Sequence, residues 1–216
     1  MNIIDDFSSF VWSLPLRSKA DAGPTLCTWL TAIEVQTTHR LRSFVTDNGE
    51  LANTQIHHFC SERGILHLFT APYTSAHNGR TERLHRTFMD KARAMRSACN
   101  APFDLWDEFC GTAAYLTNLT GSSSINGRTP YELWHGHKPC LSHLREIGCQ
   151  AFALVPTHNP KLFPRSFPCT LIGYAPNSKA YRLWDNATNR VFNSFHVSFI
   201  ESNECPQPLA PSYPPS

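Results

Sequence analysis

The chain has 216 residues, of which 41% are hydrophobic and 17% charged, so a packed core is expected and wholesale disorder is excluded. The formal net charge at pH 7 is only +2, so nucleic-acid binding would have to depend on where the basic residues lie. None of the eight cysteines forms a Cys-x-x-Cys pair, which argues against a zinc ribbon or a redox motif and favours reduced thiols.

The first third of the chain alternates between strand and helix patterns. Residues 1–17 predict β structure with a polar turn at 5–9, and residues 20–37 predict a helix. Residues 41–46 then predict a short strand that runs directly into Asp47. Further on we expect a helix over 53–63 that stops at Gly64, a strand over 65–70 and a loop over 72–79.

Two longer helices follow, one from Arg80 onward and one over 104–119. The apolar stripe of the first consists of Leu84, Phe88, Ala92, Met95 and Cys99. The second should turn inward Leu105, Trp106, Phe109, Ala113 and Leu116. Strands that alternate with helices up to this point indicate an α/β domain.

The pattern changes after a polar connector at 121–124. A short helix is predicted over 129–134, with Pro130 in its first turn. From Gly148 onward the chain is β in character, with candidate strands over 150–155, 169–174, 181–185, 190–193 and 197–200. Such short, closely spaced strands suggest a small barrel, and the proline-rich residues 202–216 suggest a flexible tail.

The N-terminal residues lack the basic-then-apolar order of a signal peptide. No apolar stretch approaches the roughly 20 residues that span a bilayer. We therefore expect no membrane association, and a protein of the nucleus and cytoplasm.

Two carboxylates carry the most informative chemistry. Asp47 closes a predicted strand, and Glu82 lies near the start of a basic predicted helix. Side chains placed in this way can share divalent ions, and two such ions about 4 Å apart stabilise both oxygens in phosphodiester exchange. Each motif alone also has a structural explanation, because Asp-Asn-Gly is a common turn and glutamate is common in the first turn of a helix.

The combination of motifs resembles the integrase of copia-type LTR retrotransposons, and the resemblance extends over nearly the whole chain up to Glu201. In the first half the matching segments are 4–8, 46–50, 59–60, 64–65, 72–74, 78–79 and 82–83. In the second half they are 130–134, 148–149, 171–174 and 181–185.

This resemblance implies a domain order. Residues 1–125 would form a ribonuclease-H-like catalytic core that lacks its first strand, and residues 126–147 a helical linker. Residues 148–201 would form an SH3-like β barrel, and residues 202–216 a disordered tail.

The resemblance also implies integration of element cDNA into host DNA by three acidic residues in an Asp, Asp, Glu series. Asp47 matches the second and Glu82 the third, and the spacing between them is one residue shorter than is usual in the family. Asp5 and Asp6 do not match the first acid, which in the family lies on an earlier strand. We therefore expect weak binding of Mg²⁺ or Mn²⁺ by Asp47 and Glu82, and no strand transfer by the isolated chain.

Partners follow from the same resemblance: DNA, both element ends and target, with RNA as an alternative ligand, and a second copy of the chain in a homo-oligomer. The candidate nucleic-acid-binding residues are Asn78, Arg83, Arg86, Arg93 and Arg96. Arg86 and Arg93 share the helix face of Glu82, where phosphate contacts would give affinity without base specificity. Lys179 and Arg182 are weaker candidates, for which a solvated position is the simpler interpretation.

Two other functions remain open. The chain could bind nucleic acid without catalysis, as a remnant with the same fold. It could also be a structural or multimerisation module in which the helix at 104–119 and the barrel make protein contacts.

Overall fold

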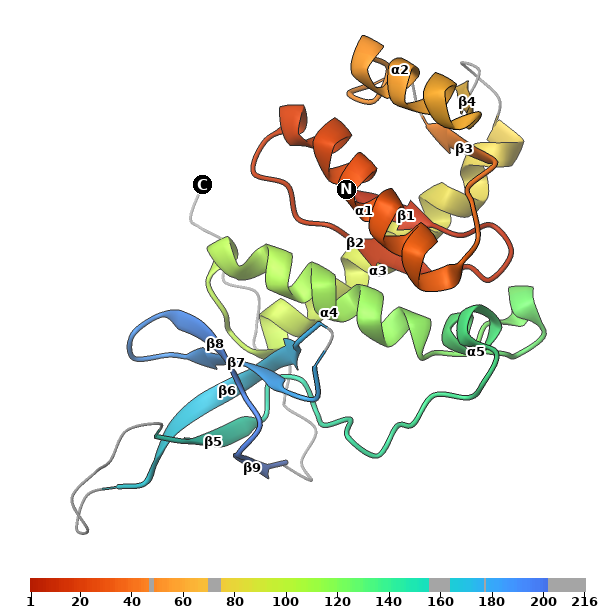
Figure 1. Cartoon of the computed structure of the whole chain (residues 1–216). Coiled ribbons are helices and arrows are strands. Elements are labelled where there is room, and N and C mark those ends of the chain that lie inside the picture. Colours follow the sequence, from red (N-terminus) through yellow and green to blue (C-terminus); the bar gives the residue numbers. More distant parts are fainter. Residues whose placement is uncertain (47–48, 70–74, 156–163, 177, 202–216) are drawn as a thin grey trace, which may run out of the picture. The chain divides into compact units, whose positions relative to one another are not determined.

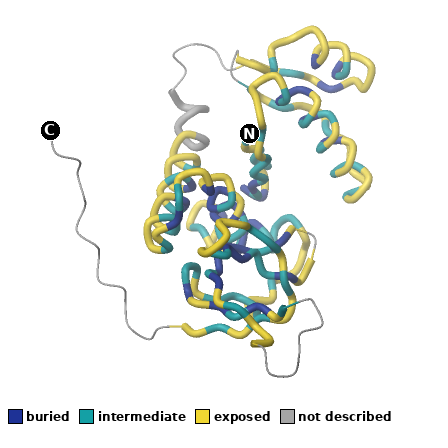
Figure 2. Tube along the Cα trace, turned by 90° about the vertical axis from the view of Figure 1, so that its left-hand side faces the viewer, coloured by how far each residue is buried: buried dark blue, intermediate teal, exposed yellow. Residues whose placement is uncertain are grey.

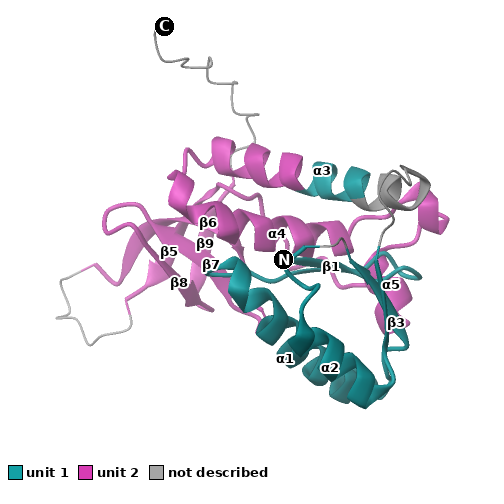
Figure 3. Ribbon diagram, turned by 90° about the horizontal axis from the view of Figure 1, so that it is seen from above, with its two compact units in different colours: residues 1–88 teal, residues 89–216 magenta. Residues whose placement is uncertain are grey.

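A computed structural model describes residues 1–46, 49–69, 75–155, 164–176 and 178–201, and for residues 75–81 it describes the backbone alone. The chain divides into two compact units, residues 1–88 and residues 89–216 (Figure 3). This division falls inside helix α3 (Ser75–Ala98). The domain boundaries expected at 125 and 148 stay predictions.

The first unit opens with an antiparallel hairpin (Figure 1). Strand β1 (Asn2–Ile4) pairs with β2 (Val11–Ser13). Between them, the Asp5 carboxylate accepts hydrogen bonds from the backbone N–H and the hydroxyl of Ser8, at 2.7 and 2.6 Å. Asp5 therefore closes the polar turn that the sequence predicts at 5–9.

A parallel pair of strands and its connecting helix form the second part of this unit. Strands β3 (Ser43–Thr46) and β4 (Leu66–Phe69) pair in parallel, which requires a crossover, and α2 (Thr54–Arg63) supplies it. The side chain of Asn53 accepts a hydrogen bond from a first-turn N–H of α2 at 2.9 Å. Gly64 ends the helix with a left-handed φ of 67°.

The core of the first unit lies between α2 and α1 (Ala22–Thr37), which follows the short 3-10 turn η1 (Lys19–Asp21). Its buried residues are Leu26, Leu30, Ile56, Cys60 and Ile65. Ile3 from β1 and Phe44 from β3 pack against the same cluster. Within the described residues the pairs β1–β2 and β3–β4 remain separate sheets, so apolar packing on the helices joins them.

Helix α3 begins at Ser75, so the expectation of a loop up to residue 79 and a helix from Arg80 is wrong. Once a helix is nucleated, each added residue gains a hydrogen bond, which can outweigh the weak helix propensity of residues such as Asn78 and Gly79. Glu82 consequently lies in the third turn rather than the first. The predicted apolar stripe is confirmed, because Phe88 and Ala92 are buried and Leu84, Met95 and Cys99 are partly buried.

The helices of the second unit follow the predicted order. After the 3-10 turn η2 (Phe103–Leu105) comes α4 (Trp106–Asn118), and after η3 (Ser123–Ile125) comes α5 (Pro130–His135). Figure 2 shows buried and exposed positions along these elements. In α4, Phe109 and Ala113 are fully buried as expected. Trp106 is 48% exposed, so its predicted inward position is wrong: it lies at the start of α4, where less of the chain covers the helix.

The C-terminal strands form one antiparallel sheet, which we call the SH3-like sheet. Its strands are β5 (Gln150–Leu154), β6 (Ser166–Tyr174), β7 (Tyr181–Asp185), β8 (Arg190–Ser194) and β9 (Val197–Ile200). Their order is β8-β7-β6-β5-β9. Because alternate side chains face the same side, one set forms a core of Cys149, Ala151, Ala153, Cys169, Leu171 and Leu183. The five strands expected from the sequence are thus confirmed.

No helix within the described part of the chain is both long and apolar enough to pass through a bilayer.

Candidate functional site

The predicted catalytic region begins where the two parallel strands end. Thr46 on β3 lies opposite Phe69 on β4, and both are the last residues of their strands. Asp47 comes directly after Thr46 in the chain, but it lies outside the described residues. Its approach to Glu82 therefore stays a prediction.

A column of side chains supports this end of the sheet. The His67 ring stacks on Phe44, with 4.3 Å between ring centroids and an interplanar angle of 15°, and it lies 4.2 Å from Phe69. His67 Nε2 is 2.8 Å from Oγ1 of Thr46, the residue that precedes Asp47. Burial, and then the nearby His57, lower the pKa of His67, so the ring is neutral at pH 7.

Sequence reasoning does not single out His67 and misses this arrangement. A signal was present, because alternate residues of a strand share a face. Phe44 and Thr46 share one face of β3, and His67 and Phe69 share one face of β4. The parallel register then brings the four side chains together.

Glu82 and Arg86 lie one turn apart on the exposed surface of α3. Neither side chain forms a hydrogen bond or an ion pair with another residue in the described ranges. Arg83 is also exposed, and Asn78 belongs to the part of α3 for which only the backbone is described. A solvated carboxylate beside a solvated guanidinium can bind a metal ion and a phosphate respectively without first breaking an internal contact.

The other basic candidates on α3 belong to the second unit and already have partners. Arg93 Nη2 lies 2.7 Å from Asp90 Oδ1. Arg96 donates from Nη1 to the carbonyl of Ala101 at 3.0 Å, and its guanidinium lies over the Phe103 ring at 5.7 Å. Contact with phosphate would compete with these interactions.

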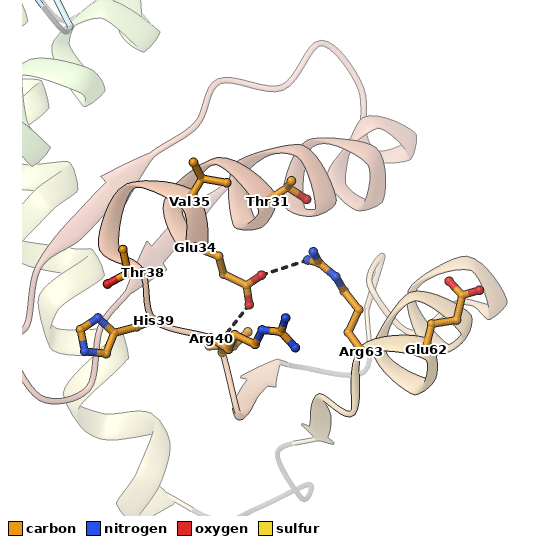
Figure 4. Close-up of a pocket in the computed structure, with 9 residues that line it drawn as sticks. Thr31, Glu34, Val35, Thr38, His39, Arg40, Glu62 and Arg63 are labelled. Carbon is orange, nitrogen blue, oxygen red and sulfur yellow. Dashed lines mark hydrogen bonds and ion pairs between the residues drawn. The ribbon is translucent and has the colours of Figure 1, made fainter.

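A separate polar pocket of about 390 Å³ lies in the first unit, between the C-terminal ends of α1 and α2 (Figure 4). At its centre the Glu34 carboxylate accepts the backbone N–H of Leu41 at 2.9 Å and pairs with Arg63 at 3.2 Å. Arg63 also lies over the Phe59 ring, at 4.9 Å. Because these charged groups satisfy one another, the pocket is best explained as an anchor between the two helices.

The thiols and the histidines form no further site in the ranges that the structure covers. Every described cysteine is free, and the described His, Cys, Asp and Glu side chains contain no group of three that could hold a metal ion.

Comparison with known proteins identifies two domains in the chain. The integrase core domain model matches residues 1–75, and the retroviral polymerase SH3-like domain model matches residues 149–212. The retrovirus-related Pol polyprotein from transposon TNT 1-94 of Nicotiana tabacum is 35% identical over 204 residues, which is 94% of this chain. The corresponding polyprotein from transposon RE1 of Arabidopsis thaliana is 30% identical over 200 residues, which is 92% of this chain. The chain spans only 15% and 14% of the length of these relatives.

One similar solved structure, with a TM-score of 0.50, supports the fold. A chain of the simian T-cell lymphotropic virus intasome in complex with the PP2A regulatory subunit B56 gamma aligns with a TM-score of 0.50 at 19% identity. That alignment covers 95% of this chain and 72% of the other. The BIV integrase catalytic core gives a TM-score of 0.47 at 20% identity, over 62% of this chain and 84% of that one.

The expected fold class, a ribonuclease-H-like α/β core followed by an SH3-like part, is therefore confirmed. The chain belongs to the integrase family of copia-type retrotransposon Pol polyproteins, of which it carries integrase-core and SH3-like sequence.

Proposed function

We propose that the first unit contributes Asp47 and Glu82 to a divalent-metal site for DNA strand transfer. Mg²⁺ or Mn²⁺ at this site would polarise the phosphate and stabilise the departing oxygen. The observation that carries the proposal is that the Glu82 side chain is exposed and makes no hydrogen bond or ion pair with the described residues. Its position on α3 follows a parallel β3–α2–β4 unit whose first strand leads directly into Asp47.

Arg86 and Arg83 would hold the phosphate backbone of element and target DNA, with Asn78, Arg93 and Arg96 as further contacts. Arg86 is the strongest of these candidates, because it is exposed beside Glu82 and is not engaged by a described carboxylate. Backbone contacts of this kind do not select a sequence, which suits insertion at many sites. Chromosomal DNA as the target places the activity in the nucleus, after synthesis in the cytoplasm.

The polypeptide of residues 1–216 alone would bind metal weakly and would not join DNA ends. The family resemblance matches only two of its three acids to this sequence, and fewer carboxylates hold a magnesium ion less firmly. A homo-oligomer would be the DNA-bound form, because the similar viral chain was solved as part of an intasome.

Metal binding tests the carboxylate pair directly. Calorimetric titration with Mn²⁺ should give weak binding to the wild type and none to Glu82→Gln or Asp47→Asn. Glu62→Gln is a matched control, because Glu62 is an exposed helical glutamate of the same unit that forms an ion pair with His58. Unchanged Mn²⁺ binding in Glu82→Gln would refute the site. Efficient end joining by the wild-type polypeptide that is lost in Glu82→Gln would instead refute its predicted inactivity.

Non-catalytic nucleic-acid binding is the second candidate, and the exposed Arg83 and Arg86 favour it independently of the carboxylates. DNA binding that survives Glu82→Gln, in a protein that binds no Mn²⁺, would support it over the metal-dependent function. Competition with RNA of the same length would separate the two nucleic acids. If neither binds at low salt, only the structural or multimerisation function remains, and sedimentation would then measure the oligomer.

A further inference from the structure

The SH3-like sheet carries an irregularity that helix α4 fills. Leu171 on β6 lies opposite Leu183 on β7, whereas Gly173 lies opposite Arg182, so Ile172 is an extra residue in β6. Such a bulge leaves backbone groups unpaired in the ladder. The Ile172 carbonyl accepts a hydrogen bond of 2.8 Å from Oγ1 of Thr112 on α4, and the whole contact is buried.

The residue after the bulge lets α4 approach this closely. A Cβ atom placed on Gly173 would overlap Thr112 Oγ1 and would lie 3.3 Å from Thr112 Cβ. Any side chain at position 173 would therefore collide with the hydroxyl that satisfies Ile172. The bulge and the glycine together form a seat for Thr112.

An ion pair lies beside this seat. Arg182 donates from Nε to Glu108 Oε2 at 2.8 Å and from Nη2 to Glu108 Oε1 at 2.5 Å, which is a two-pronged arrangement. The side chains are only 31% and 20% exposed. Hydrogen bonding to Glu108 is the largest influence on the pKa of Arg182 and raises it. A third nitrogen of Arg182 donates to Asn193 at 3.2 Å, which leaves the guanidinium little capacity for phosphate.

Tyrosine hydroxyls connect the segment before the SH3-like sheet both to α4 and to the sheet. The Tyr115 hydroxyl on α4 is 2.6 Å from Nε2 of His143, and the Tyr181 hydroxyl on β7 donates to the carbonyl of His143 at 3.1 Å. The Tyr174 hydroxyl on β6 accepts from the N–H of Arg145 at 3.0 Å and donates to its carbonyl at 3.1 Å. The segment around residues 143–145 is thus held against both α4 and the sheet.

We infer that α4 is the docking partner of the SH3-like sheet, recognised through the Thr112–Gly173 seat and the Glu108–Arg182 ion pair. The sheet is then a fixed part of the second unit and not a module on a free tether (Figure 1). Arg182 serves as a contact to Glu108 rather than as a contact to nucleic acid. This inference does not depend on the proposed metal site.

Hydrogen exchange of the full chain, followed by mass spectrometry of peptides, tests the docking. Glu108→Arg and Arg182→Glu should each speed exchange by about tenfold or more in peptides from both α4 and β6–β7, because a partly buried charge loses its partner and faces a like charge. The double variant, which swaps the charges, should recover most of the protection. Arg190→Glu is the control, since Arg190 is an exposed residue of β8, and its effect should not reach α4.

A second pair of variants tests the seat without changing charge. Gly173→Ala should weaken protection in α4 as well as in β6, and adding Thr112→Ala should restore part of it by removing the colliding hydroxyl. Loss of protection confined to the mutated element in both series would overturn the inference. So would Arg182→Ala if it weakened DNA binding while the protection of α4 stayed unchanged.

Discussion

Oγ1 of Thr46 and Nε2 of His67 lie 2.8 Å apart across two neighbouring parallel strands. Thr46 is the last residue of β3, so the His67 ring braces the point at which the chain leaves the sheet toward Asp47. The ring is itself held by stacking on Phe44. His67 therefore supports the end of β3 next to the proposed metal site.

We expect His67 to make the first unit sensitive to acid. Burial lowers the pKa of His67 below its ordinary value of 6.5, so the unfolded chain binds the proton more readily. The contribution of the neutral His67 ring to the stability of the fold is fully present above pH 6.5. It is lost as the pH falls toward the lowered pKa. In urea unfolding at about pH 7.5 and about pH 5.5, His67→Gln should lose less stability on acidification than the wild type. His58→Gln, a change at an exposed histidine, should behave like the wild type; an equal effect of both variants would contradict the prediction.

Two glycines should respond to alanine in opposite directions. Gly64 ends α2 with a φ of 67° and has open space around it, so Gly64→Ala should cost about 1 kcal/mol through backbone strain alone. Gly111 lies inside α4 and also has open space, so Gly111→Ala should add roughly 0.5–1 kcal/mol to the free energy of unfolding. Denaturant titration measures both changes in the free energy of unfolding. A destabilising effect of Gly111→Ala would contradict the open space around Gly111.

DNA binding should depend on salt through Arg86. Each phosphate contact contributes about 0.9 to the slope of log affinity against log salt concentration, so Arg86→Ala should reduce that slope by about one contact. Arg17→Ala is the control, because Arg17 is an exposed arginine of the same unit that lies outside α3. Fluorescence anisotropy with a labelled duplex at several salt concentrations gives both slopes, and equal slopes for the two variants would exclude a special role of Arg86.

Among the described cysteines, Cys140 should react first with iodoacetamide. It is exposed, and hydrogen bonds from Ser142 lower its pKa, whereas burial raises the pKa of Cys99 to about 12 and that of Cys149 to about 11. The thiolate is the reactive form, so its larger population at Cys140 favours alkylation there. Peptide mapping after short exposure near neutral pH measures the order. Ser142→Ala should slow the reaction at Cys140, and faster labelling of Cys149 would contradict the burial of that residue.

Local signals explain why much of the fold follows from the sequence. Helix α2 starts and ends as predicted because its two ends depend on local residues. The Asn53 side chain caps the first turn, and Gly64 ends the helix with a left-handed backbone. The strands of the SH3-like sheet follow because short apolar segments are separated by turns. The start of α3 and the exposure of Trp106 do not follow, because helix extension and the cover over a helix end depend on the rest of the molecule.

The candidate site is predicted less completely for the same reason. Glu82 and Arg86 share a helix face, which helical periodicity alone establishes. The engagement of Arg96 by Phe103, and of Arg182 by Glu108, brings together residues from different elements. Composition gives no hint of such pairings, so a basic residue in the sequence can be read as a phosphate contact when its charge is already used internally.

The separation of β1–β2 from β3–β4 has a practical consequence for handling the protein. Within the described residues β3 pairs only with β4, and the apolar side chains of Val45 and Leu66 are 59% and 58% exposed. A short strand at a sheet edge with exposed apolar side chains can pair with a strand of another molecule. Purification at high concentration should thus promote self-association through this edge. The substitution Val45→Lys should reduce that self-association.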